Sequence, residues 1–381
     1  MKPIPIHQSY DNLGTHAVCH ALKHDAGQEY LVNFHLPPDE KAVESDPTPL
    51  LLNSIEGCVR PHHSTINPAL PNVLFIGSRE TIAGVNSLHE PATEYTPGVV
   101  GIDSLLEDTP QLRDICNVHY KQVTNVDSID IDSTILEQIR LGVQDGLNSS
   151  EYAGVVVWHE TDTLEETAQY VQLTTLNEKP VVFTGAMRAS TDLSPDGPTN
   201  LLGSAVVACS TNSKNRGVLV VFNNQIYSAS MIMKTDSDSV DAFISQSRLG
   251  TVHNNIAQFL FQPSRPTNDH YLAVHNNIIL PRVDIIYAHQ GCGDVDVMDP
   301  IQKGARGLVL AGSWKRDAIN GSLAMLAEHN FPVVMASHTM HGFVASGYGF
   351  VGAGYLSARQ ARIRLQLVIA TAEDPRRFFT N

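Results

Sequence analysis

Residues 154–188 read GVVVWHETDTLEETAQYVQLTTLNEKPVVFTGAMR, and they contain two apolar runs separated by a helix-like segment. The apolar runs, at residues 154–159 and 179–184, have the length of buried strands. A strand, a helix and a second strand in this order indicate a parallel β-α-β unit. Ligands of such sheets bind beyond the carboxyl ends of the strands, so the loops after these runs are candidate site loops.

The same alternation continues on both sides of this unit. PNVLFIG at residues 71–77 and RGVLVVFNN at residues 216–224 read as strands, and NLLGSAVVACS at residues 200–210 reads as a helix. We therefore predict a larger N-terminal domain, residues 71–265, built on a parallel sheet with helices on both faces.

A second alternation follows a polar stretch that carries prolines, and we predict an interdomain linker at residues 266–281. Strand-like RVDIIYAHQ, RGLVLAGS and FPVVMASH then alternate with helix-like GSLAMLAEHN and SARQARIRLQLVIATA. This pattern predicts a smaller C-terminal α/β domain, residues 282–381. Residues 1–70 are rich in His, Pro and acidic residues and lack apolar periodicity, so we expect a partly disordered N-terminal extension.

The overall composition limits the classes of function. A chain of 381 residues is long for one core, which agrees with two domains. The formal net charge of −15 argues against nucleic acid and anionic membrane surfaces as partners. We see no signal-peptide pattern and no run of about 18 apolar residues, and the cysteines are scattered. The sequence therefore predicts a cytoplasmic protein.

Side chains that could carry out chemistry follow several predicted strands. Thr81 and Thr161 each come soon after an apolar run, Asp162 is next to Thr161, and Lys234 lies in a later loop. A lysine that is neutral when it acts can accept the proton of a threonine hydroxyl, and a carboxylate can orient the lysine. Taken singly, a threonine after a strand is more often a turn or capping residue. No metal site and no cofactor are predicted.

Several segments together resemble the bacterial-type L-asparaginases, which share their fold with glutaminase-asparaginases. The segments are HETDTLEETAQYVQL, KPVVFTGAMRASTDLSPDGPTNLL, RGVLVVFNN, SMIMKTDSDSVDAF and GYLSARQARIRLQLVIATAEDP. The resemblance implies a two-domain asparaginase-like α/β fold and hydrolysis of asparagine to aspartate and ammonia through an acyl-enzyme. It also implies a homotetramer, arranged as a dimer of dimers, that acts on a small molecule without a metal or cofactor.

The resemblance assigns catalytic roles to five residues. Thr81, in RETIAG, is the threonine nucleophile, and Tyr95, in TEYTPG, is its partner. Thr161, Asp162 and Lys234 form the Thr–Asp–Lys set of the family.

The resemblance also assigns contacts with the substrate. Ser128, in NVDSID, corresponds to the serine that binds the substrate carboxylate. Asp162 would also face the substrate amino group. The backbone near Ala186 would help to hold the reacting amide.

Three positions depart from the family pattern, which has glycines there. TGGTIAG becomes SRETIAG, which places Arg79 and Glu80 before Thr81, and HGTDT becomes HETDT, which places Glu160 before Thr161. Such side chains add bulk, alter the backbone N–H groups and bring carboxylates close to a substrate carboxylate. Three functions stay open: asparagine hydrolysis, reaction with a different substrate in specialised metabolism, or a catalytically impaired relative.

Overall fold

The computed structural model describes residues 59–62, 66–78, 102–124, 126–176, 178–245, 248–265, 270–312 and 320–379. It also describes a small antiparallel sheet of β1 (Ser9–Tyr10), β2 (His16–Lys23) and β3 (Glu29–His35). The predicted partial disorder of residues 1–70 falls mostly outside the described residues. Arg79, Glu80, Thr81 and Tyr95 also lie outside them.

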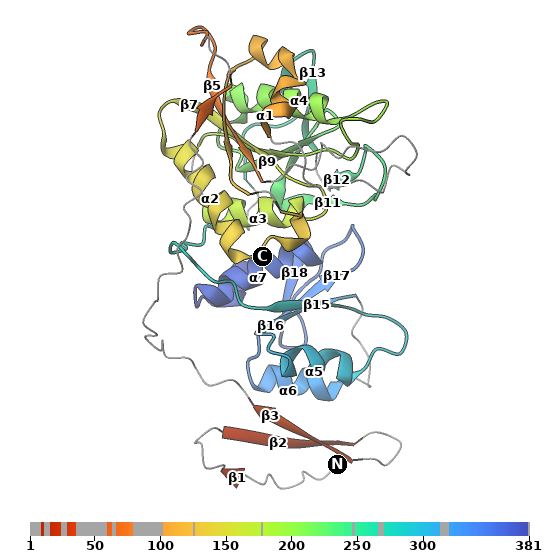
Figure 1. The fold of residues 1–381 in the computed structure, drawn as a ribbon. Coiled ribbons are helices and arrows are strands. Elements are labelled where there is room, and N and C mark those ends of the chain that lie inside the picture. The colour runs from red at the N-terminus through yellow and green to blue at the C-terminus, as the bar shows by residue number, and fades with distance from the viewer. Residues whose placement is uncertain are drawn as a thin grey trace.

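The larger domain is built on a sheet of nine described strands in the order β14-β13-β10-β9-β8-β7-β5-β6-β4 (Figure 1). The strands are β4 (Arg60–Pro61), β5 (Asn72–Gly77), β6 (Asn117–Gln122), β7 (Tyr152–Trp158), β8 (Val181–Thr184), β9 (Val218–Phe222), β10 (Gln225–Ser228), β13 (Arg248–His253) and β14 (Ile256–Phe259). The central strands from β6 to β9 are parallel, as predicted. Antiparallel strands extend the sheet at both edges.

One antiparallel edge of the sheet begins at a tight turn between β9 and β10. The strand predicted at residues 216–224 wrongly included this turn. Asn223 and Asn224 have positive φ angles of 46° and 59°, and they join β9 to β10. Asparagine tolerates this conformation better than most residues, and two such residues form a hairpin turn. The predicted strand at residues 216–224 therefore ends at Phe222.

Helices cover both faces of the large sheet. They are α1 (Ile102–Glu107), α2 (Ser133–Asn148), α3 (Leu164–Thr174) and α4 (Gly197–Cys209). Val155 and Val157 of β7 lie in one buried cluster with α2 and α3, whereas Val156 and Trp158 lie in another with α1 and α4. Successive strand residues point to opposite faces, so a strand covered on both sides reads as a continuous apolar run.

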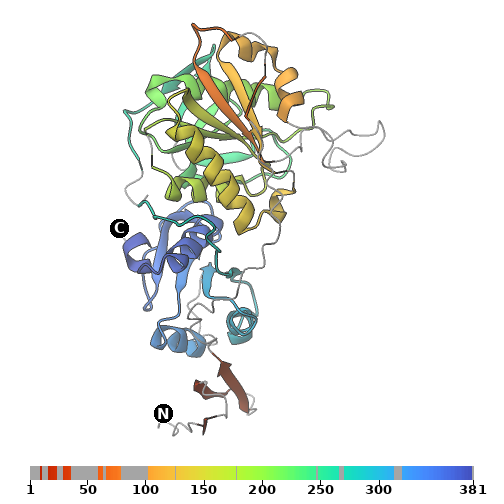
Figure 2. The same ribbon diagram turned by 60° about the vertical axis from the view of Figure 1, so that its left-hand side comes forward.

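The smaller domain has a parallel sheet in the order β15-β16-β17-β18. Its elements are β15 (Val283–Tyr287), α5 (Asp294–Gln302), β16 (Gly307–Ala311), α6 (Asn320–Glu328), β17 (Val333–Ser337), β18 (Val351–Ser357), α7 (Ala358–Ala370) and α8 (Pro375–Phe379). Val309 shares a cluster with α7, and Leu308 shares another with α5 and α6. The small sheet is therefore also covered on both faces (Figure 2).

The two domains meet where α3 lies beside α7 (Figure 1). One buried apolar cluster includes residues of both helices, so the core is continuous across this junction. An ion pair of 3.0 Å joins Arg362 of α7 to Glu166 of α3. Among the described residues, no helix is both long and apolar enough to cross a membrane.

Candidate active site

The loop of residues 159–163 connects the carboxyl end of β7 to α3, at the centre of the large sheet. Lys234 was predicted in a loop, but it is the last residue of strand β11 (Ile232–Lys234). Its side chain reaches the loop of residues 159–163. Its Nζ donates a hydrogen bond to Thr161 Oγ1 at 2.9 Å and forms an ion pair with Asp162 Oδ1. Residues 73 positions apart in the chain are thus in direct contact.

The three side chains differ in their exposure to solvent. Thr161 is buried, the Lys234 side chain is 13% exposed and that of Asp162 is 67% exposed. The lysine therefore lies between a buried hydroxyl and a carboxylate that solvent can reach. A lysine in this position can exchange a proton with the hydroxyl, and the carboxylate keeps its amino group directed there.

Lys234 is held in place from both domains. β11 pairs antiparallel with β12 (Phe243–Ser245), opposite Phe243. From the small domain, Gln360 Nε2 donates to the carbonyl oxygens of Ala229 at 2.7 Å and Ile232 at 3.1 Å. These bonds fix the backbone that leads to the lysine.

The small domain also contacts the residue 159–163 loop directly. Arg359, near the start of α7, donates from Nη1 to the Asp162 carbonyl oxygen at 2.7 Å. The same atom lies 3.7 Å from Glu165 Oε1. Sequence reasoning missed Arg359 and Gln360. The Ser357–Gln360 capping box marks the start of α7, but nothing local indicates that this helix supports a loop of the other domain.

Glu165 is a buried acid at the start of α3. Burial raises the pKa of its carboxyl group to about 8, against the opposing influence of Arg359 and of a hydrogen bond from Ser357. Burial disfavours the charged form of an acid, and the half-exposed guanidinium only partly compensates. The carboxyl group therefore retains its proton well above the pH at which an exposed glutamate would lose it.

Ser128 is attached to the same loop through two hydrogen bonds. Its backbone N–H donates to Glu160 Oε2 at 2.8 Å, and its carbonyl oxygen accepts from Thr163 Oγ1 at 3.0 Å. The Ser128 side chain is buried, and its Oγ has no hydrogen-bond partner among the described residues. Glu160, which stands where the family has a glycine, therefore uses one of the two donors of Ser128.

Ala186 follows a glycine that lies directly against the residue 159–163 loop. A Cβ atom on Gly185 would lie 2.2 Å from the carbonyl oxygen of His159 and 3.6 Å from Thr161 Cγ2. A side chain at this position would overlap the backbone, so the close approach requires glycine. The Gly185 carbonyl also accepts a hydrogen bond of 3.0 Å from Asn200 Nδ2. The backbone at Ala186 is thus kept near Thr161.

The structure therefore brings together Thr161, Asp162 and Lys234, and it places Ser128 and Ala186 around them. The positions of Thr81 and Tyr95, and of the altered residues Arg79 and Glu80, lie outside the described residues.

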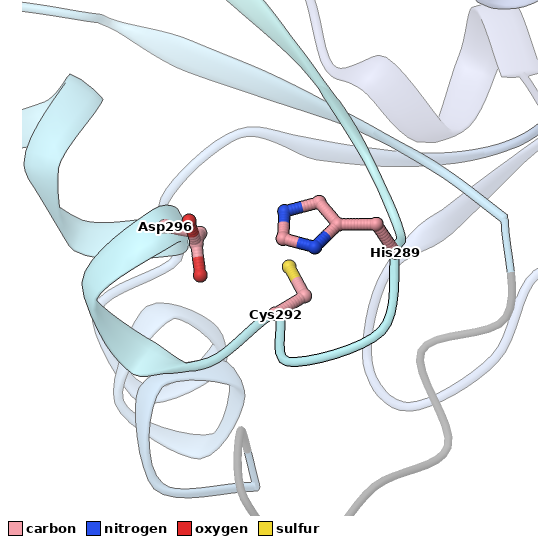
Figure 3. Close-up of side chains that lie close together, drawn as sticks. All are labelled: His289, Cys292 and Asp296. Carbon is pink, nitrogen blue, oxygen red and sulfur yellow. The ribbon is translucent and has the colours of Figure 1, made fainter.

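A possible metal-binding cluster, which sequence reasoning missed, lies between β15 and α5 (Figure 3). Ligand atoms of His289, Cys292 and Asp296 lie within 4.8 Å of one another, and the donor types would suit zinc. However, Asp296 Oδ2 already accepts the Gly293 N–H at 2.7 Å, which caps the N-terminus of α5. Cys292 is buried in an apolar cluster. Capping of α5 explains the position of Asp296, and packing in the apolar core explains that of Cys292, so neither requires a metal.

Comparison with known proteins agrees with this architecture. Residues 72–265 match the family described as "Asparaginase, N-terminal", and residues 282–379 match the "Glutaminase/Asparaginase C-terminal domain". The chain therefore belongs to the asparaginase family, in accord with the resemblance in its sequence.

Individual relatives are similar over most of their length. L-asparaginase 2 of Bacillus subtilis is 36% identical over 323 residues, which cover 81% of this chain and 85% of that protein. Probable L-asparaginase 4 of Schizosaccharomyces pombe is 36% identical over 311 residues, 80% of this chain and 87% of that protein. The crystal structure of a probable cytoplasmic L-asparaginase from Campylobacter jejuni has a TM-score of 0.75 and 32% identity, and it covers 81% of this chain and 98% of that one.

Proposed function

We propose that this protein is an asparaginase-type amidohydrolase, which hydrolyses the side-chain amide of L-asparagine or a related amide and releases ammonia. The observation that carries the proposal is the contact of Lys234 with both Thr161 and Asp162. Membership of the asparaginase family supports it, because the relatives described above are named as asparaginases.

We assign the catalytic roles as follows. Thr81 attacks the amide carbon to form an acyl-enzyme, and Tyr95 assists its proton transfer. Thr81 and Tyr95 form one pair of reacting groups, and Thr161 with Lys234 as its base forms the second pair. Asp162 orients the lysine and faces the substrate amino group. Hydrogen bonding between Lys234 and Thr161 supports the second pair.

We assign substrate contacts to the groups that surround this set. By family resemblance, Ser128 corresponds to the serine that binds the substrate carboxylate, and the backbone near Ala186 contacts the reacting amide. Their link to the loop of residues 159–163 supports both assignments. The family resemblance further suggests a homotetramer built as a dimer of dimers. A cytoplasmic location is supported by the Campylobacter jejuni relative, which is named as cytoplasmic.

The test is ammonia release from L-asparagine and L-glutamine by the natural protein and by Lys234→Met. Methionine keeps the unbranched side chain but cannot accept a proton, so kcat should fall by about 10²- to 10⁴-fold. Lys303→Met is the control. Lys303 follows the C-terminus of α5, is exposed and pairs with Asp299, so its replacement should leave kcat unchanged. Equal kcat in the natural protein and Lys234→Met would refute the proposed base. Release of no ammonia by the natural protein would favour a different substrate or a catalytically impaired relative.

A further inference from the structure

Two neighbouring carboxylates in the candidate site have different partners. Asp162 pairs with Lys234, whose Nζ also contacts Thr161. Glu160, on the other side of Thr161 in the chain, directs its carboxylate to the N–H of Ser128. The site therefore contains a carboxylate of the protein that is bound at Ser128, in addition to the one paired with the lysine.

Ser128 offers a pair of donors suited to a carboxylate. The residue is 3% exposed, its N–H is 2.8 Å from Glu160 Oε2, and its Oγ is buried without a hydrogen-bond partner among the described residues. Buried donors need partners, and charge-assisted hydrogen bonds to a carboxylate are stronger than bonds to neutral acceptors. Glu160 supplies such a carboxylate from within the chain.

A substrate carboxylate at Ser128 would have to displace Glu160 or lie beside it. Displacement of Glu160 breaks its hydrogen bond with the Ser128 N–H. Binding beside Glu160 places the negative charges of the substrate carboxylate and of Glu160 in contact. A substrate without a carboxylate meets neither obstacle. If that substrate carries an ammonium group, Glu160 and Asp162 both attract it.

We infer that Glu160 determines substrate specificity: its carboxylate takes the place of a substrate carboxylate at Ser128, so the preferred substrate is a primary amide whose amino-bearing carbon carries no carboxylate. This inference rests on the proposed function. The matched probe is β-alaninamide, which is L-asparagine without its carboxylate. Its hydrolysis breaks the carbonyl carbon–nitrogen bond and consumes one water, which yields β-alanine and ammonia.

The experiment measures kcat and KM for ammonia release from L-asparagine and β-alaninamide with the natural protein, Glu160→Gln and Glu160→Gly. The natural protein should favour β-alaninamide. Glu160→Gly frees the Ser128 N–H and should shift the ratio of kcat/KM values toward asparagine on the order of 10- to 100-fold, mainly through a lower KM for asparagine. Glu160→Gln keeps an acceptor of the same shape without charge, so its shift should be smaller.

Controls separate this effect from a general loss of structure. Glu178→Gln changes the charge equally at an exposed site and should leave the ratio as in the natural protein. If the glycine variant fails to fold in a thermal unfolding scan, Glu160→Gln still tests the charge. An unchanged ratio in the folded Glu160 variants would overturn the inference, even if both amides are hydrolysed and the proposed function stands.

A binding measurement distinguishes failure of the inference from failure of the proposed function. Titration calorimetry compares the two product acids, L-aspartate and β-alanine. If no variant releases ammonia, binding of β-alanine to the natural protein, with L-aspartate bound only by Glu160→Gly, would support the role of Glu160 while the proposed function fails. The inference would be overturned if the natural protein and Glu160→Gly showed the same preference between L-aspartate and β-alanine. It would also be overturned if no variant bound either acid.

Discussion

Glu165 is 1% exposed and lies in the first turn of α3, which follows the candidate active-site loop. Burial raises its pKa from 4.5 to about 8. Between these values the folded protein binds a proton that the unfolded chain has released. Stability is lost with rising pH wherever the folded state binds more protons, so this group lowers stability as pH rises from 4.5 to about 8.

Glu165→Gln should therefore reduce the loss of stability at alkaline pH. Glutamine is neutral at every pH. The difference in free energy of unfolding between the variant and the natural protein should therefore shift in favour of the variant by on the order of a few kcal/mol from pH 5 to pH 9. The measurement is chemical or thermal unfolding at a series of pH values. Glu178→Gln, at an exposed position, should follow the natural protein. A gain in stability that is the same at pH 5 and pH 9 would contradict the role given to burial.

At this scale the sequence indicated which residues could form a site, but not all of the contacts among them. It indicated Thr161, Asp162 and Lys234 as a set, and the structure brings them into contact. It also marked Glu160 as an added carboxylate. The bond from Ser128 to Glu160 was not predictable, because the direction of a side chain on a loop depends on what lies opposite it in the fold.

Among the elements, α7 has a residue in its first turn that both caps the helix and contacts the large domain. Gln360 closes the capping box with Ser357 through Oε1, and its Nε2 bonds the carbonyls of Ala229 and Ile232 before Lys234. One side chain thus caps the start of α7 and fixes the strand that carries the candidate base. The apolar pattern predicted the helix, whereas its contact with β11 arises from the packing of the two domains.

Gln360→Ala should lower both stability and kcat. It leaves two buried carbonyl oxygens without this donor, which should cost about 1–3 kcal/mol, and it loosens the backbone before Lys234. Gln366→Ala is the matched control, because Gln366 lies on the same helix and bonds the Pro281 carbonyl away from the site. That variant should lose stability and retain kcat. Thermal unfolding and steady-state ammonia release measure the two effects, and equal kcat in both variants would argue against a positioning role for Gln360.

For the whole molecule, the large sheet and the N-terminal strands are separate hydrogen-bonded units. β1, β2 and β3 pair with one another, and among the described strands the large sheet begins at β4. The family match also begins at residue 72. The core that supports the candidate site is therefore built from residues after β3.

Deletion of residues 1–58 should leave the unfolding midpoint, kcat and KM as in the full chain. The physical reason is that the deletion removes β1, β2 and β3 but no strand of the large sheet or of the β15-β16-β17-β18 sheet. Thermal unfolding, ammonia release and the solution mass from light scattering would check this. A lower midpoint or a smaller assembly would instead show that the N-terminal segment stabilises the fold or the contacts between subunits.

The sequence by itself determined the α/β class, the parallel centre of the large sheet, the smaller second sheet and the membership of the family. These features depend on short-range order along the chain, since apolar runs and helical faces are set by neighbouring side chains. Only the tertiary structure decided that Lys234 meets Thr161, that Arg359 holds the Asp162 carbonyl and that Glu160 binds Ser128. These contacts join residues 32 to 197 positions apart, and they exist only because separate strands and helices stack in one particular arrangement.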